Sequence, residues 1–256
     1  MKVYKAYAKV NIFLKITGMR GNYHEIISRF MRVDSLYDEL SFTPKEEYSF
    51  KIIGNFSCET QQNTIYKAYL ALMEATASDS LEKLMFTYAV EVKKSIPAFA
   101  GLGGGSSDAA TYLKMCNEVL HLGLSLNELA AIGLKVGADV PFFIYGYNSA
   151  NVSGIGEIVE EFQETLLDFE VVTPDIKIST PKVYQIYREN FYAPIDGFET
   201  EKLKKTSSLE ILNSMSADEA NDLFKPALHQ YKELKNHYKH GWYFSGSGSS
   251  FFRVMV

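Results

Sequence analysis

The first third of the chain groups β-branched and aromatic residues in short runs, a pattern that predicts strands. Residues 18–22 contain two glycines and an asparagine and predict a turn after the first of these strands. Residues 63–75 instead carry apolar side chains at helical spacing. The segments with the strand pattern are residues 2–16, 28–36, 48–53 and 88–93.

Helical spacing returns after residue 108. The first such helix has one apolar face, made of Ala109, Leu113, Cys116 and Leu120. Ser125 and Glu128 form the sequence signature of a capping box at the start of the second helix. Asp139 follows a helix end and precedes Pro141, so the local chain is biased to be extended. It leads to an expected strand at residues 142–145. Residues 153–157 predict a turn between strands.

The character of the sequence changes near residue 166, where we predict a domain boundary. The predicted domains are residues 1–165 and 166–256. Residues 197–206 are charged and are expected to be exposed. Strands and helices mix without strict alternation, which predicts an α+β fold. In the second domain we expect strands at 169–173, 242–244 and 251–255, and helices at 181–190, 209–215 and 221–238.

The glycine-rich stretch at residues 97–110 reads Pro-Ala-Phe-Ala-Gly-Leu-Gly-Gly-Gly-Ser-Ser-Asp-Ala-Ala. A glycine loop that leads into a helix presents free N–H groups and a positive dipole end, which bind anions. The stretch lacks the Gly-Lys-Ser/Thr ending of a P-loop, and Ser106 replaces the last glycine of the dinucleotide pattern. A flexible linker would lack the strand before it and the helix after it, so we expect a phosphate-binding loop.

Composition narrows the functional classes. With 46% hydrophobic and 22% charged residues, the 256-residue chain is typical of globular proteins. The net charge of −5 gives no electrostatic support for coating nucleic acid. Cys58 and Cys116 are far apart, which favours reduced thiols in the cytoplasm over a disulfide framework or a zinc site. No apolar run reaches membrane-spanning length, and residues 1–4 do not resemble a signal peptide, so we expect a cytoplasmic protein without a membrane partner.

Three separated motifs together resemble the GHMP kinase superfamily. They are the Ala-Lys-Val-Asn run at residues 8–11, the loop at residues 97–110 and the Ser-Gly-Ser-Gly run at residues 245–248. The resemblance covers almost the whole chain. It implies a two-domain fold, with an N-terminal domain like ribosomal protein S5 domain 2 and a ferredoxin-like C-terminal domain.

Two further signs narrow the resemblance to family members that act on a CDP-linked polyol. They are the Tyr-His pair that ends residues 18–24 and the Gly-Ala-Asp-Val-Pro run at residues 137–141. The implied reaction is phosphoryl transfer from ATP to the 2-hydroxyl of the methylerythritol part of that small molecule, in the non-mevalonate route to isoprenoids.

The resemblance implies that the glycine-rich loop wraps the ATP phosphates. Mg²⁺ is expected with ATP because the charge of the triphosphate must be neutralised. Its protein ligands are not identified by the sequence, with Ser107 and Asp108 as candidates. The expected ATP-binding residues are Pro97, Ala98, Phe99, Ala100, Gly101, Leu102, Gly103, Gly104, Gly105, Ser106 and Ser107.

The family places its catalytic aspartate at the position of Asp139, which implies that this carboxylate accepts the proton of the attacking hydroxyl. On the residues alone, a helix-end cap or a solvated turn acid is equally expected. Lys9 matches the catalytic lysine of the family, whose ammonium would keep Asp139 ionised. Asn11 lies two residues on, hence on the same face of a strand, and could orient the substrate or the aspartate. Polar residues within an apolar segment argue against a merely exposed strand edge.

The resemblance assigns the cytosine base to Tyr23 and His24, with Tyr184 on the other side of the base. Aromatic rings offer stacking faces, and a histidine can read the polar edge of a base. Gly246 and Gly248 would let the C-terminal loop approach the substrate. A plain surface position for Tyr23 and His24, and a simple hairpin turn for the two glycines, are the alternatives.

Two departures from the family pattern concern Phe99, which is bulkier than usual there, and the end of the chain soon after the third motif. Because the family often continues further, dimer contacts inferred from relatives do not carry over directly, and a homodimer stays an open hypothesis. Two other functions also stay open on the sequence alone. One is a GHMP kinase with another acceptor alcohol, of the homoserine or mevalonate type. The other is a non-catalytic nucleotide- or RNA-binding module on the same fold, which the net charge and the Lys9 and Asp139 pair argue against.

Overall fold

The computed structural model describes residues 2–255 and mixes helices with strands, as expected for an α+β protein. Its backbone forms two compact units, each assembled from separate stretches of the chain. The first unit comprises the described parts of residues 1–8, 36–98 and 104–146. The second comprises the described parts of residues 9–35, 99–103 and 147–256. The predicted division between residues 165 and 166 stays a prediction.

Two long strands, β1 (Tyr4–Arg20) and β2 (Tyr23–Pro44), contribute residues to both units. They are paired with each other, and the turn predicted at residues 18–22 is confined to Gly21 and Asn22, because β1 continues to Arg20. In the first unit, the end of β2 pairs antiparallel with β4 (Tyr88–Lys93). The short strand β3 (Ile52–Ile53) pairs parallel with β4.

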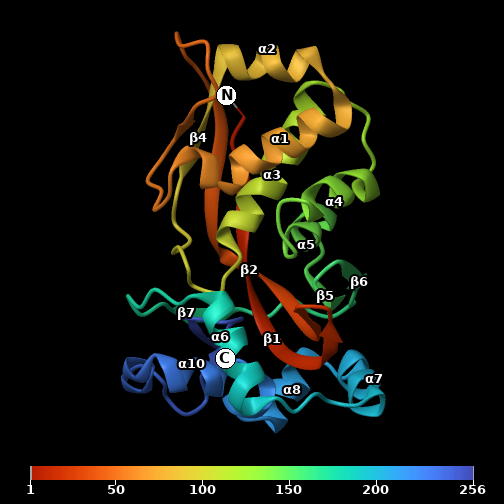
Figure 1. The fold of residues 1–256 in the computed structure, drawn as a ribbon, viewed down its shortest axis with the longest axis vertical. Helices are drawn as coiled ribbons and strands as arrows, with labels where there is room; N and C mark the ends of the chain where they lie inside the picture. The colour runs from red at the N-terminus through yellow and green to blue at the C-terminus, as the bar shows by residue number, and fades with distance from the viewer. Residues whose placement is uncertain (1, 256) are drawn as a thin grey trace. The chain divides into compact units, whose positions relative to one another are not determined.

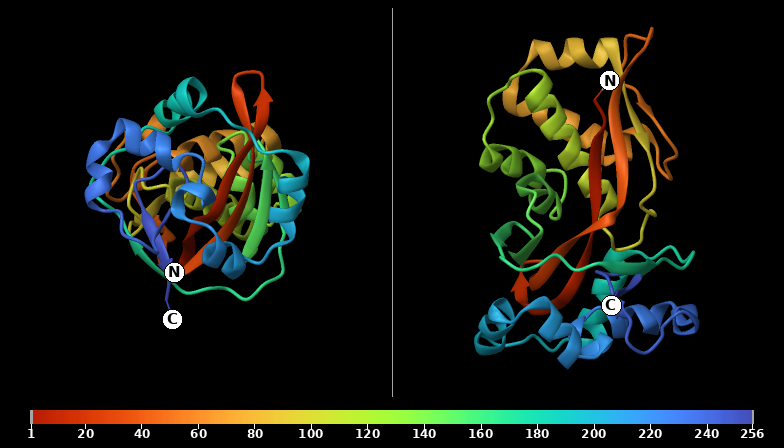
Figure 2. Two further views of the ribbon diagram at one scale, coloured as in Figure 1. Left: turned by 90° about the horizontal axis from the view of Figure 1, so that it is seen from below. Right: turned by 180° about the vertical axis from the view of Figure 1, so that it is seen from behind.

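Local capping signals explain where the helices of the first unit begin. Asn63 Oδ1 accepts from Ile65 N, and Ser125 and Glu128 form the predicted capping box. In Figure 1 and the right panel of Figure 2, α1, α3, α4 and α5 lie on one side of the strands of this unit. The helical elements are η1 (Thr60–Gln62), α1 (Thr64–Thr76), α2 (Asp79–Thr87), α3 (Gly104–Val119), α4 (Leu126–Leu134) and α5 (Val140–Tyr145).

In the second unit, the first half of β2 pairs antiparallel with β5 (Ser149–Gly154), which pairs with β6 (Ile158–Glu161). A separate three-stranded antiparallel sheet has the order β7 (Phe169–Val172), β9 (Phe251–Val254), β8 (Tyr243–Phe244). The helical elements are α6 (Thr180–Ile186), the π-helical turn η2 (Tyr187–Phe191), α7 (Gly197–Lys205), α8 (Ser208–Ser214), α9 (Ala217–Ala220), α10 (Phe224–Gln230) and the 3₁₀ turn η3 (Lys232–Asn236).

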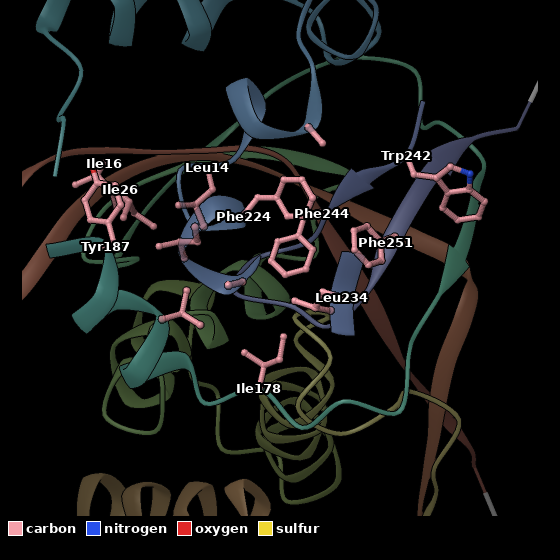
Figure 3. Packing of buried hydrophobic residues seen from close by; sticks show 14 residues of the cluster. Leu14, Ile16, Ile26, Ile178, Tyr187, Phe224, Leu234, Trp242, Phe244 and Phe251 are labelled. Atoms are coloured by element: carbon pink, nitrogen blue, oxygen red, sulfur yellow. The ribbon is translucent and has the colours of Figure 1, made fainter. Parts of the chain in front are cut away.

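A large apolar cluster forms the core of the second unit (Figure 3). Ile16 and Ile26, from β1 and β2, lie beside the ring of Tyr187 from η2. Phe224 and Phe244 pack with their ring centroids 5.0 Å apart. The core therefore combines the N-terminal hairpin with residues from the C-terminal third of the chain.

The predicted strand at residues 142–145 is wrong, because these residues form helix α5. Asp139 has φ −80° and ψ −13°, a helical conformation, and Val140 begins the helix, although the chain before Pro141 was expected to be extended. Pro141 lies in the first turn of α5, where its missing N–H costs nothing, and Gly146 ends the helix in the left-handed region. A short apolar run can be a buried helix or a buried strand, and its periodicity does not distinguish them.

Two other predictions were wrong, and two helices, α2 and α7, were not predicted. The strand expected at residues 48–53 is reduced to β3. The single helix expected at residues 221–238 is interrupted at Tyr231, where φ is −116° and ψ is 77°. The charged segment at residues 197–206 contains helix α7, which Asp196 caps through Glu199 N at 2.8 Å. Among the described residues, no helix is both long enough and apolar enough to cross a bilayer.

Candidate active site

The two ends of the predicted phosphate loop lie in the first unit, where α3 begins inside the loop at Gly104. A Cβ on Gly104 would lie 2.8 Å from Ile96 Cγ2, so the close packing at this position requires glycine. Thr64 Oγ1 donates to Gly105 O at 2.6 Å and attaches the start of α1 to the loop. The residues of the predicted site in this unit are Pro97, Ala98, Gly104, Gly105, Ser106 and Ser107.

The first turn of α3 carries the groups expected to bind an anion. Its first N–H groups have no partner within the helix, and the helix dipole adds positive potential at this end. Ser106 is half-buried and Ser107 is buried, so both hydroxyls belong to the packed start of the helix.

Asp139 belongs to the same unit and directly precedes α5. Its carboxylate makes no capping hydrogen bond to that helix, which removes the support for a helix-cap role. A Cβ on Gly137 would lie 3.7 Å from Ser106 Oγ, so the turn at residues 137–139 lies against the start of α3. The turn that carries the predicted base therefore packs beside Ser106, at the helix end of the predicted phosphate loop.

In the second unit, Lys9 and Asn11 are buried and bonded to each other. Lys9 Nζ donates to Asn11 Oδ1 at 2.5 Å and to Gly101 O at 3.0 Å, and it lies 4.5 Å from the centroid of the Phe30 ring. Asn11 Nδ2 donates to Ser28 Oγ at 2.9 Å. Lys9 and Asn11 are thus held in fixed positions and do not form an exposed strand edge.

Residues 99–103, the middle of the predicted phosphate loop, also belong to the second unit. Lys9 N donates to Leu102 O at 3.0 Å, and Ser250 N donates to Ala100 O at 3.1 Å. Gly103 has φ +72°, a conformation that favours glycine. Phe99 has φ +56° and is 55% exposed, so its extra bulk lies in solvent.

Ser245 joins these groups, and no role for it was predicted. Its hydroxyl donates to Gly101 O at 2.9 Å and accepts from Asn11 N at 3.3 Å. Ser28 was also missed, although a serine among apolar strand residues is a detectable signal. The partner of Ser245 at Gly101 lies 144 residues away in the chain, and nothing local indicates it.

The loop at residues 245–250, which contains the third predicted motif, is a hairpin connection between β8 and β9. In it, Ser245 N donates to Ser250 O at 3.0 Å. Gly246 has φ +58°, and a Cβ there would lie 3.3 Å from Asn11 Oδ1. Gly248 packs against Phe244, whose Cζ would be 2.2 Å from an added Cβ. The hairpin alternative is therefore correct as a description, and Gly246 also lies beside Asn11.

His24, predicted to hold the cytosine, packs between aromatic rings of the second unit. Its ring centroid is 5.0 Å from that of Tyr184 and 5.7 Å from that of Tyr187. Tyr187 was not predicted, because it follows the end of α6 and looks like an ordinary core residue. Tyr23 is 66% exposed, so the structure gives this ring no fixed position beside His24.

The surroundings of His24 favour the neutral imidazole. Burial, with a smaller contribution from the charge of Arg188, lowers its pKa below the ordinary value of 6.5. Nε2 is buried and has no hydrogen-bond partner within residues 2–255. A neutral imidazole with one unsatisfied ring nitrogen is suited to hydrogen-bonding the edge of a base.

Comparisons with known proteins agree with this geometry. Residues 63–147 match the family described as GHMP kinases N terminal domain. A protein of Sulfurimonas denitrificans named 4-diphosphocytidyl-2-C-methyl-D-erythritol kinase is 74% identical over 99% of this chain and 97% of its own length. The protein of the same name from Helicobacter pylori strain J99 is 40% identical over 98% of this chain and 94% of its own length.

Solved structures give the same result. A crystal structure titled 4-(cytidine 5'-diphospho)-2C-methyl-D-erythritol kinase matches with a TM-score of 0.73 and 28% identity, over 99% of this chain and 90% of that one. The mevalonate kinase of Methanococcus jannaschii matches with a TM-score of 0.57 and 14% identity, over 100% of this chain and 90% of that one, which shows a shared fold. The chain therefore belongs to the 4-diphosphocytidyl-2-C-methyl-D-erythritol kinase family of the GHMP kinases.

Proposed function

We propose that the protein transfers the γ-phosphoryl group of ATP to the 2-hydroxyl of 4-diphosphocytidyl-2-C-methyl-D-erythritol. The products are ADP and the 2-phosphate, in the non-mevalonate route to isoprenoids. One structural observation carries the proposal: the turn that holds Asp139 lies against the start of α3, next to Ser106. A carboxylate beside a phosphate loop is what transfer to an alcohol requires.

Phosphoryl transfer depends mainly on positioning and on stabilising negative charge. The N–H groups at the start of α3 stabilise the negative charge of the phosphates. Because the packed helix already fixes their direction, they need not reorient when ATP binds. Asp139 accepts the proton of the substrate hydroxyl as the new oxygen–phosphorus bond forms. The proton stays on the Asp139 carboxyl group until water removes it, and the β–γ phosphoanhydride bond breaks to release ADP.

Lys9 contributes a fixed positive charge. Asn11 and the Gly101 carbonyl hold its ammonium, so the charge does not depend on a mobile side chain. We propose that it stabilises charge that develops during transfer. Asn11 positions Lys9 through its own bond to Ser28.

We propose that Mg²⁺ accompanies ATP. In the part of the chain that the structure describes, no group of three or more His, Cys, Asp or Glu side chains could hold a metal. This fits an ion held chiefly by phosphate oxygens, with the Ser107 hydroxyl as the candidate protein ligand. Asp108, the other candidate, already accepts a hydrogen bond from Lys94 at 2.7 Å. When bound, Mg²⁺ would neutralise charge on the triphosphate.

The cytosine of the substrate is proposed to bind at His24 and Tyr184. The ring of Tyr184 offers a stacking face, and the imidazole of His24 packs beside it with ring centroids 5.0 Å apart. Tyr23 is largely exposed, and its part in binding the base stays a prediction. The homodimer and the cytoplasmic location stay predictions.

The test is ADP release with the CDP-linked substrate as the acceptor, and with homoserine and mevalonate as comparison acceptors. Asp139→Asn should lower kcat by about 10²–10⁴-fold, because asparagine cannot accept the proton. The matched control is Asp196→Asn at the N-cap of α7, where asparagine caps as well as aspartate. Equal ADP release by the Asp139 variant and the wild type would rule out Asp139 as the base. ADP release with homoserine or mevalonate, and none with the CDP-linked substrate, would contradict the proposed substrate.

A further inference from the structure

A buried cluster of three charged side chains lies beside the phosphate loop, in the first unit. Lys94 Nζ donates to Asp38 Oδ2 at 2.5 Å and to Asp108 Oδ2 at 2.7 Å. The side chains of Asp38 and Asp108 are 0% and 3% exposed, and that of Lys94 is 17% exposed. Buried charges of this kind are expensive unless they are paired, so the cluster must be held closely.

Asp38 also holds the backbone that enters the loop. Its Oδ1 accepts from Ser95 N at 2.5 Å and from Ile96 N at 2.9 Å. These are the last two amides before Pro97 begins the predicted phosphate loop. Asp38 comes from β2, which is paired with β4, so the loop entrance is attached to the sheet.

Asp108 attaches the other end of the loop. It lies in α3, four residues after the helix begins at Gly104 and directly after Ser107. Because Lys94 bonds both aspartates, it connects the segment before the loop to the helix after it. A Cβ on Gly104 would lie 3.6 Å from Lys94 Nζ, so the ammonium is also close to the first residue of α3.

The charges within the cluster are not balanced, because one ammonium faces two carboxyl groups. Burial raises the pKa of Asp108 to about 7, while Lys94 acts to lower it and Asp38 to raise it. Burial lowers the pKa of Lys94, but the two aspartates outweigh it, so the net shift is upward. The ammonium is therefore required here, since removing it would leave two buried acids together.

We infer that Asp38 and Lys94 are positioning residues, which fix both ends of the phosphate loop so that the N–H groups of α3 align on the ATP phosphates. This inference rests on the proposed use of ATP. It assigns the cluster to the nucleotide and gives it no part in binding the CDP-linked substrate. Misplacing catalytic groups by about 1 Å can cost 10²-fold in rate, and supporting residues typically contribute 10–100-fold.

The test compares Lys94→Met with Lys93→Met, whose side chain is 72% exposed and lies 3.7 Å from Glu39. In Lys94→Met, the KM for ATP and the Kd for ADP, measured by calorimetry, should rise about 10–100-fold. The KM for the CDP-linked substrate should stay within about twofold, and Lys94→Arg should recover part of the ATP affinity because it restores the charge. Lys93→Met should match the wild type.

A second variant covers the case in which Lys94→Met does not fold. Asp38→Asn keeps an oxygen for the two loop amides and loses the charge that pairs with Lys94, so a smaller rise in the same two constants is expected. A folded Lys94 variant with unchanged ATP and ADP constants would overturn the inference, as would an equal rise in the KM of both substrates. The calorimetric Kd separates this inference from the proposed function, because it needs no turnover.

Discussion

His24 shows how one residue's surroundings set its chemistry. The imidazole packs against two tyrosine rings, and its Nε2 finds no partner among the described residues. Burial lowers its pKa, so the folded protein favours the neutral form. Below about pH 6.5 the unfolded chain binds a proton at this residue that the folded chain resists. The contribution of His24 to stability is therefore complete above pH 6.5 and is lost as the pH falls below it.

We expect the free energy of unfolding of the wild type to fall more steeply between pH 7.5 and 5.5 than that of His24→Phe, because phenylalanine does not titrate. Urea denaturation at both pH values measures the difference. His121→Phe is the control, since this histidine is outside the aromatic cluster. Parallel pH dependence in the wild type and His24→Phe would show that the folded protein does not resist protonating His24.

At the scale of elements, glycine positions decide how segments can approach. Gly101 and Gly123 have nearly the same positive φ, +73° and +71°. A Cβ on Gly101 would lie 2.1 Å from Ser245 O, a backbone atom that cannot rotate away. A Cβ on Gly123 would meet nothing within 4 Å. Both sites carry the cost of a positive φ, and the space around an added Cβ differs between them.

Gly123→Ala should therefore destabilise the protein by about 1–2 kcal/mol, the cost of a left-handed conformation for alanine. Gly101→Ala should cost about 1–3 kcal/mol more from overpacking, and it should lower kcat because Gly101 O holds the Lys9 ammonium. Chemical denaturation and ADP release measure the two effects. Equal stability of the two variants would mean that the hairpin loop yields easily to the added methyl group.

For the whole molecule, the core of the second unit depends on residues from distant parts of the chain. Leu14, Ile16 and Ile26 belong to the same cluster as Phe224 and Phe244 (Figure 3). Burying an aliphatic side chain contributes about 1.5–3 kcal/mol, so these three contribute roughly 5–9 kcal/mol. That amount is comparable to the whole stability of a typical domain, about 5–15 kcal/mol.

We therefore expect residues 166–256, expressed alone, to lack a cooperative thermal transition. The fragment should also give poorly dispersed amide proton signals in NMR spectra, because its core would lack the side chains of Leu14, Ile16 and Ile26. The full chain is the control, and it should unfold cooperatively in the same buffer. A fragment with dispersed amide signals would support the predicted boundary between residues 165 and 166 as the limit of an independently folding domain.

The sequence predicted those parts of the fold and site that depend on local signals. The capping box of Ser125 and Glu128 is confirmed, as are the strand at residues 88–93 and the helix that starts at Thr64. Helix α5 was predicted as a strand, because a short apolar run fits both structures and only its packing decides. The roles of Ser245 and Tyr187 were missed for a similar reason, since the partners of both lie far along the chain.

The sequence by itself determined the family, the glycine-rich loop that leads into a helix, and the residues proposed for catalysis. Glycines, caps and short motifs act within a few residues, so their meaning can be read locally. Only the tertiary structure decided that Asp38, Lys94 and Asp108 share one buried cluster and that Ser245 meets Gly101. Lys94 lies 56 residues from Asp38 in sequence, and only the packing of strands and helices brings such groups together.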